Sequence, residues 1–170
     1  MLKINRFLLL TVGLIVLIIV SLMLKPILYF FFLSYFLPDI TPQMRAKQLA
    51  SINRDTVAIL DTRSYQEFKV SHLPGARWVG FDEFNLNKID SLPQNTTIVL
   101  YCSVGYRSDL VGEKLLDAGY NNVFNLWGGI FTWVNNGLPV YNDNEQTDQI
   151  HPYSKKWSFW LSKGKFNYGE

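Results

Sequence analysis

The chain has one cysteine, Cys102, among its 170 residues. A single thiol excludes an internal disulfide, and it also excludes a zinc site of the cysteine-cluster type. The charge balance is nearly even, because the formal net charge is +2. Binding to a nucleic-acid backbone needs a clustered basic face, so we expect no nucleic-acid partner. The sequence also lacks an internal repeat and a long low-complexity tract. We therefore expect one small folded domain behind an apolar leader.

The leader is apolar enough to cross a membrane. Residues 7–24 read FLLLTVGLIVLIIVSLML and carry no charge. As a helix they would extend about 27 Å, which is close to the thickness of the hydrocarbon core of a bilayer. A cleaved signal peptide is the alternative, but the apolar run is longer than usual and no small-x-small cleavage site follows it. We predict an uncleaved single-pass transmembrane anchor, with membrane lipid as its partner.

The residues around this span suggest how it ends and how it is oriented. Lys25 and Pro26 are expected to close the membrane span. The aromatic run at 27–37 is too short to cross again, so we expect it in the membrane interface or, alternatively, packed on the domain as an apolar helix. Lys3 and Arg6 precede the span, whereas only Lys25 follows it closely. The positive-inside rule then predicts that the soluble domain lies on the outer (periplasmic or extracytoplasmic) side.

The rest of the chain alternates between strand and helix patterns. The runs TVAIL at 56–60 and TTIVLY at 96–101 are continuous and rich in β-branched residues, as in strands that a parallel sheet buries on both faces. Ser64 followed by Glu67 is a capping box, which predicts a helix that stops before Pro74. The alternation predicts an α/β fold, a parallel sheet with helices on both faces. Further expected strands are 77–80 and 122–126, and further expected helices are 44–52, 107–118 and 130–136.

Composition divides the chain into three segments: the anchor and its aromatic segment at 1–37, the α/β domain at 43–141 and a tail at 142–170. The tail begins with a polar linker and ends with lysines interleaved with tryptophan and phenylalanine. That mixture suits a membrane surface. Packing of these aromatic side chains on the domain is an equal alternative.

Cys102 stands between a predicted buried strand and a predicted helix. Such a loop directs backbone N–H groups into one concavity, and the helix start adds partial positive charge. Anions are favoured there, including a thiolate, the form that attacks sulfur or phosphorus. Gly105 lets the loop curl and Arg107 adds a fixed cation; a small buried cysteine is the alternative use of Cys102. The candidate catalytic residue is Cys102, and the candidate substrate-binding residues are Ser103, Val104, Gly105, Tyr106, Arg107 and Ser108.

An ordered set of motifs in this chain resembles the rhodanese family of sulfurtransferases. The set spans about 45–140 and consists of LDTR and EF within 60–68, SHLPGA at 71–76, the loop at 102–108, LLDAGY at 115–120, LWGGI at 126–130 and GLPV at 137–140. The resemblance implies a rhodanese-like fold and a persulfide on Cys102, with no metal and no organic cofactor. The chain departs from the family at Ser71, where glycine is usual, and at Ser103, where many members carry a basic residue. The second departure predicts weak activity on thiosulfate.

Other polar residues near these motifs are interpreted as structural. Asp61 is expected to bind nearby backbone N–H groups in a turn, which agrees with the architectural role that the resemblance implies. Arg63 and Glu67 are four residues apart and could pair on a helix face. His72 is expected to anchor a turn rather than serve as a base for the cysteine. Core and lid packing is the expected role of Trp127 and Trp133, and Trp127 flanking the pocket is an alternative.

The hypothesis is a sulfurtransferase that moves a sulfane sulfur through a Cys102 persulfide. Its partners would be a small anionic donor, such as thiosulfate or polysulfide, and a thiol (small molecule or protein) or cyanide as acceptor. A phosphatase or arsenate reductase on the same fold is one alternative, but only four residues separate Cys102 from Arg107, fewer than in the loop of related phosphatases. A non-catalytic interaction or redox-sensing module tethered to a membrane is the other alternative.

Overall fold

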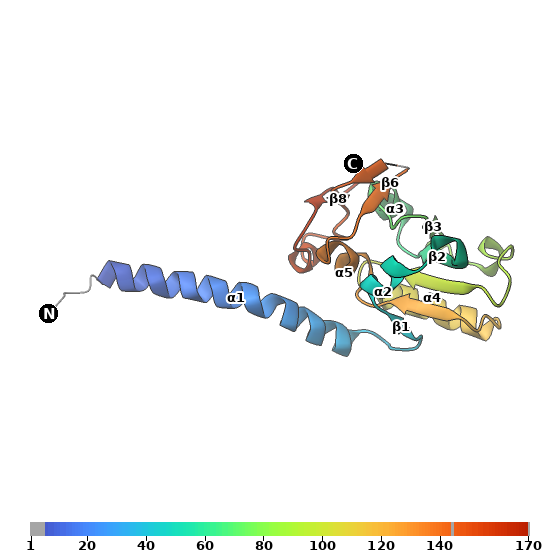
Figure 1. Ribbon diagram of the computed structural model, residues 1–170, viewed down its shortest axis with the longest axis horizontal. Helices are drawn as coiled ribbons and strands as arrows, with labels where there is room; N and C mark the ends of the chain where they lie inside the picture. The colour runs from blue at the N-terminus through green and yellow to red at the C-terminus, as the bar shows by residue number, and fades with distance from the viewer. Residues whose placement is uncertain (1–5, 144, 170) are drawn as a thin grey trace. The chain divides into compact units, whose positions relative to one another are not determined.

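The computed structural model describes residues 6–143 and 145–169 (Figure 1). The chain forms two compact units, one that ends at Phe36 and one that begins at Leu37. The first unit is a helix, α1 (Arg6–Phe36). Its part Leu9–Phe36 has a mean hydropathy of 2.5, which makes it long and apolar enough to cross a membrane. That property is one of length and composition.

Helix α1 continues through Pro26, so the helix does not end at Lys25 and Pro26, and the end of the membrane span at these residues stays a prediction. Proline removes one backbone hydrogen bond and clashes with the preceding turn, which favours a kink or an end. The residues that follow are apolar and aromatic without a glycine, and they continue the helix to Phe36. The aromatic run at 27–37 is therefore not a separate segment, because all but its last residue belong to α1.

The second unit contains a five-stranded parallel sheet in its described residues. Its strands are β1 (Gln43–Met44), β2 (Val57–Asp61), β3 (Arg77–Trp78), β4 (Thr97–Tyr101) and β5 (Val123–Leu126). They lie in the order β1-β5-β4-β2-β3, so β4 is central. In the register, Leu60 of β2 lies opposite Leu100 of β4. Both residues are buried together with Ile98 and Val99, as the continuous apolar patterns predict.

The helices of this unit are α2 (Ala46–Ser51), α3 (Tyr65–Val70), α4 (Tyr106–Asp117) and α5 (Gly129–Asn135). Parallel crossovers are right-handed, so crossovers that move in opposite directions along the sheet place their helices on opposite faces. The crossover from β4 to β5 through α4 runs opposite to those through α2 and α3. Helix α5 contacts α2. The predicted α/β fold, with helices on both faces of a parallel sheet, is therefore present.

The predicted boundaries agree with the main elements to within about two residues, but several short elements have no sequence prediction. Strand β1 pairs with β5 at the sheet edge, although its two residues are too few to show a pattern. Short 3₁₀ helices occur at η1 (Arg54–Thr56) and η2 (Leu86–Lys88). The capping box predicted for α3 is present, because the Ser64 side chain accepts from the Glu67 N–H and the Glu67 carboxylate accepts from the Ser64 N–H.

The residues after α5 form a folded C-terminal arm. Strands β6 (Val140–Asn142) and β7 (Glu145–Thr147) pair antiparallel, and β8 (Gln149–Ile150) and β9 (Lys165–Phe166) pair parallel, with η3 (Trp157–Trp160) between them. The side chain of Asn135 in α5 donates to the Trp160 carbonyl at 2.9 Å. Strand β8 contacts α3 (Figure 1). The arm thus packs on the domain, which was one of the two alternatives for the tail.

Candidate active site around Cys102

The predicted nucleophile lies at the carboxyl end of the central strand. Cys102 directly follows β4, and α4 begins at Tyr106. The Cys102 side chain is buried, and its Sγ accepts a hydrogen bond of 3.1 Å from the N–H of Gly105. Gly105 has φ of 110°, a left-handed conformation that glycine adopts without strain, and this turn points its N–H back at the sulfur. A donor aimed at the sulfur stabilises negative charge there.

A polar residue in the neighbouring strand β5 holds the cysteine loop by hydrogen bonds. Asn125 of β5 is fully buried. Its side-chain N–H donates to the Gly105 carbonyl at 2.8 Å, and its side-chain oxygen accepts from the Ser108 hydroxyl at 2.7 Å. Asn125 therefore fixes both the turn that carries the Gly105 N–H and the first turn of α4. Its signal in the sequence is a polar residue inside the otherwise apolar run VFNL.

A second support comes from the start of α5. The N–H groups of Ile130 and Phe131 donate to the carbonyls of Cys102 and Ser103 at 2.9 and 3.1 Å. Such bonds require the two backbones to lie close together, and they meet at Gly129. A Cβ atom at Gly129 would lie 2.3 Å from the Cys102 carbonyl oxygen. Gly129 is therefore a packing requirement of the cysteine loop.

Arg107 is bonded to Glu67, a residue that the sequence assigned to local structure. The two terminal nitrogens of Arg107 each donate to a carboxylate oxygen of Glu67 at 3.1 Å. The Ser103 hydroxyl joins them, because it donates to Glu67 at 2.9 Å and accepts from Arg107 at 3.1 Å. The Arg107 side chain remains 21% exposed, whereas that of Glu67 is 3% exposed. Glu67 is thus a fixed counterion for Arg107, and part of the Arg107 side chain remains accessible to solvent.

The charges in this cluster stabilise one another. Burial alone would raise the pKa of Glu67, but the positive charges of Arg63 and Arg107 lower that pKa to about 2. Burial alone would lower the pKa of Arg107, but the negative charges of Cys102 and Glu67 raise it. A thiolate at Cys102 therefore lies within the electrostatic reach of the Arg107 guanidinium.

The spacing of Arg63 and Glu67 suggested a pair on the helix face, but Arg63 bonds to other residues instead. Its guanidinium bonds to the Asp61 carboxylate at 2.6 Å and to the Ser71 carbonyl at 2.6 Å, and both charged side chains are fully buried. Asp61 also accepts from the backbone N–H of Arg63 at 2.9 Å, so the predicted turn role of Asp61 is confirmed. Arg63 bonds to Asp61 rather than to Glu67 because the turn after β2 points the side chains of Arg63 and Asp61 inward.

The remaining predicted residues divide into loop and support. Val104 is buried in the loop, and Tyr106 is 40% exposed. His72 Nδ1 lies 3.1 Å from the Phe68 carbonyl oxygen, which agrees with its predicted role in a turn. Trp133 is buried and donates its indole N–H to the Pro139 carbonyl at 2.8 Å, so its predicted core role is confirmed. Trp127 stacks on the Arg45 guanidinium at 4.2 Å from its ring centroid.

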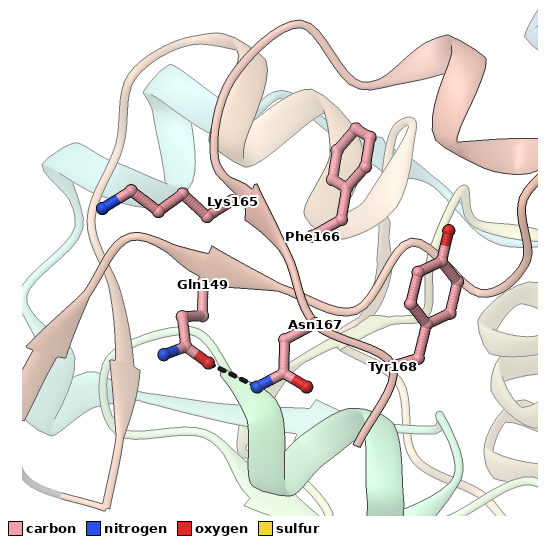
Figure 2. Close-up of a pocket in the computed structure, with 5 residues that line it drawn as sticks. All are labelled: Gln149, Lys165, Phe166, Asn167 and Tyr168. Atoms are coloured by element: carbon pink, nitrogen blue, oxygen red, sulfur yellow. Dashed lines mark hydrogen bonds between the residues drawn. The ribbon is translucent and has the colours of Figure 1, made fainter. Parts of the chain in front are cut away.

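A separate hollow of about 440 Å³ lies on the C-terminal arm (Figure 2). Its wall includes Gln149 of β8 and the residues 165–168, and the side chain of Asn167 donates to that of Gln149. None of the predicted site residues lines it. Within 6–143 and 145–169, no group of three or more histidine, cysteine, aspartate or glutamate side chains is placed to hold a metal ion.

Comparisons with known proteins give the same identification for the domain. The model of the rhodanese-like domain family matches residues 45–136. The solution structure of the rhodanese-like domain of an Anabaena protein superimposes with a TM-score of 0.55 at 25% identity, covering 59% of this chain and 79% of that chain.

Several curated relatives carry sulfurtransferase names. A sulfurtransferase of Allochromatium vinosum is 28% identical over 102 residues, which cover 60% of this chain and 92% of the relative. The adenylyltransferase and sulfurtransferase UBA4 of Meyerozyma guilliermondii is 36% identical over 101 residues, which cover 54% of this chain. The match spans 24% of that yeast protein's length, so the likeness to it concerns one domain.

Proposed function

The chain belongs to the rhodanese-like domain family, and we propose that it is a sulfurtransferase with Cys102 as its nucleophile. The observation that carries the proposal is the Gly105 N–H, which donates to the Cys102 sulfur at 3.1 Å at the end of the central strand. This hydrogen bond supports a thiolate at Cys102, because backbone dipoles and the start of α4 favour negative charge there. The same position favours the negative outer sulfur of a persulfide.

The reaction proceeds in two transfers. The Cys102 thiolate attacks the sulfane sulfur of an anionic donor such as thiosulfate or polysulfide. A bond forms between the two sulfurs, the donor's sulfur–sulfur bond breaks, and its electron pair leaves with the donor remnant, which is sulfite for thiosulfate. An acceptor thiolate or cyanide then attacks the outer sulfur, and the electron pair of the persulfide bond returns to Cys102. Neither transfer needs a metal or an organic cofactor.

The other loop residues bind the donor in this proposal. The backbone amides of 103–108 surround the outer sulfur, and the exposed part of Arg107 binds the anionic remnant of the donor. Because Arg107 is already bonded to Glu67, a donor anion shares the guanidinium with that carboxylate. This sharing supports weak use of thiosulfate, as the serine at position 103 also predicts.

Replacing Arg107 with alanine is expected to lower kcat/KM for thiosulfate. Loss of one charge-assisted contact corresponds to a fall of roughly ten-fold to more than a hundred-fold. Steady-state kinetics with cyanide as acceptor measures it. The single variant also leaves the buried Glu67 carboxylate without its Arg107 counterion, although Ser64 and Ser103 still donate to it, so we expect a lower unfolding temperature as well.

The double variant Glu67→Gln/Arg107→Ala separates these two effects. Glutamine removes the stranded charge and keeps a side chain that suits the third position of a capping box. We expect thermal unfolding to return toward the wild-type temperature while the kinetic defect persists. A double variant with wild-type kcat/KM would show that Arg107 acts on stability alone.

We also propose that α1 anchors the protein in a membrane, with the domain on the outer side. One support is the apolar stretch Leu9–Phe36, in which only 6% of the most apolar 18-residue window is buried. The support for the orientation is the pair of basic residues, Lys3 and Arg6, that precede this stretch. The full chain is expected to stay with membranes in alkaline carbonate. Protease added to intact cells is expected to cleave the domain. Release by carbonate would contradict the anchor, and cleavage only after lysis would contradict the orientation.

A further inference from the structure

The C-terminal arm contacts the end of the cysteine loop, although its residues lie beyond the part of the sequence that matches the family. The family match ends at residue 136, whereas the arm contributes His151, Tyr153 and Tyr168 near α3 and α4. Ile150 and Leu161 are buried and fasten the arm to the domain. The arm is therefore a part of this chain that the comparisons leave without a role.

Tyr153 lies over the cation of the site. The centre of the Arg107 guanidinium is 5.2 Å from the centroid of the Tyr153 ring, within the range of a cation–π contact. Glu67 and Ser103 bind the terminal nitrogens of the same guanidinium. Hydrogen bonds thus hold the terminal nitrogens while the centre of the guanidinium lies over the aromatic ring, and both contacts restrict the position of Arg107.

The backbone is strained to present this ring. Tyr153 has φ of 63°, which is uncommon for a bulky side chain and persists only where neighbouring structure enforces it. The constraint comes from His151, whose Nδ1 accepts the Tyr153 N–H at 3.0 Å. The other ring nitrogen of His151 lies 3.2 Å from the Tyr168 carbonyl oxygen, so it carries the proton and donates. His151 thereby ties Tyr153 to the end of the arm.

We propose that Tyr153 is a positioning residue for Arg107 and that the arm forms the outer wall of the cysteine site. The proposal deepens the proposed function, because a guanidinium held in advance binds an anionic donor without losing further side-chain freedom. Tyr153 acts through Arg107, so its replacement is expected to affect anionic reagents more than neutral ones.

The test compares two thiol reagents of similar size, the anion iodoacetate and the neutral iodoacetamide. Each alkylates Cys102 by forming a carbon–sulfur bond and releasing iodide, and no other thiol competes because the chain has one cysteine. The ratio of the two rates reports the cation beside the sulfur. In Tyr153→Leu we expect this ratio to fall about two- to five-fold, the size of a cation–π contact at an exposed site. Tyr153→Phe keeps the ring face and is expected to keep the wild-type ratio.

A matched control and a second background make the result specific. Phe166 is an aromatic residue of the same arm that is 48% exposed, compared with 49% for Tyr153, and Phe166→Leu is expected to leave the ratio unchanged. In the Glu67→Gln/Arg107→Ala background, adding Tyr153→Leu is expected to change nothing further. An unchanged ratio in Tyr153→Leu, an equal fall in Tyr153→Phe, or the same fall without Arg107 would overturn the proposal. Alkylation needs no sulfur transfer, so this result is independent of whether a persulfide forms.

Discussion

Cys102→Ser is expected to abolish sulfur transfer and to leave the fold intact. A serine hydroxyl cannot hold a persulfide, because its oxygen does not form a stable bond to the transferred sulfur. It is slightly smaller than the thiol and can still accept the Gly105 N–H, so the buried loop keeps its hydrogen bond. Thiocyanate formation from thiosulfate and cyanide measures the transfer, and circular dichroism with thermal unfolding measures the fold.

This variant is decisive because no second cysteine can replace the first. Thiocyanate formation by the serine variant at the wild-type rate would contradict the assignment of Cys102 as the nucleophile. A variant that unfolds is distinguished by its thermal transition. Cys102→Ala then serves as the second replacement, because alanine removes the acceptor of the Gly105 N–H but brings no hydroxyl that must itself find a buried partner.

Gly129→Ala is expected to inactivate the protein without touching the predicted nucleophile. The added Cβ would lie 2.3 Å from the Cys102 carbonyl oxygen and 2.7 Å from the Ser103 carbonyl carbon. Both atoms are backbone, so the loop itself must move. A displacement of about 1 Å at a reacting group costs on the order of a hundred-fold in rate. We expect at least that loss in kcat/KM, together with a lower unfolding temperature.

Gly75→Ala provides the matched control for this variant. Gly75 has φ of 72° and Gly129 has φ of 54°, so both substitutions carry the strain of a left-handed residue, about 1 to 2 kcal/mol. At Gly75, however, no atom lies within 4 Å of the added Cβ. We expect Gly75→Ala to lose some stability and to keep its activity. Equal activities of the two alanine variants would show that the contact at Gly129 does not set the loop geometry.

The main strands and helices were predictable because their signals are local. The β-branched runs before Asp61 and Cys102 correspond to β2 and β4, and the capping box of Ser64 and Glu67 starts α3. The position of Cys102 followed from the rule that parallel strands present their carboxyl ends to a site. Two-residue strands such as β1 and β3 carry too little pattern to define their ends.

The partners within the site were not predictable from local signals. Glu67 and Arg107 are 40 residues apart, whereas sequence spacing suggested Arg63 as the partner of Glu67. Asn125 and Tyr153 reach the loop through the fold of β5 and the arm. Such outcomes depend on tertiary contacts, which composition and periodicity do not contain.

The same cysteine and arginine would also suit a phosphatase, so the substrate of the loop must be tested directly. Four residues separate Cys102 from Arg107, and within that loop the Gly105 N–H already points at the sulfur. A ring of this size fits the single outer sulfur of a persulfide, whereas a phosphoryl group presents three oxygens around phosphorus. We therefore expect the loop to accept sulfane sulfur and to reject phosphate esters.

The most direct measurement is the intact mass of the purified chain after exposure to thiosulfate or polysulfide, beside hydrolysis of an aryl phosphate by the same sample. Cys102→Ser is the blank for both. We predict a gain of one sulfur atom that cyanide removes, without hydrolysis above the blank. Hydrolysis that depends on Cys102, with no added sulfur, would make the protein a phosphatase. Absence of both activities would contradict catalysis and favour a tethered interaction module.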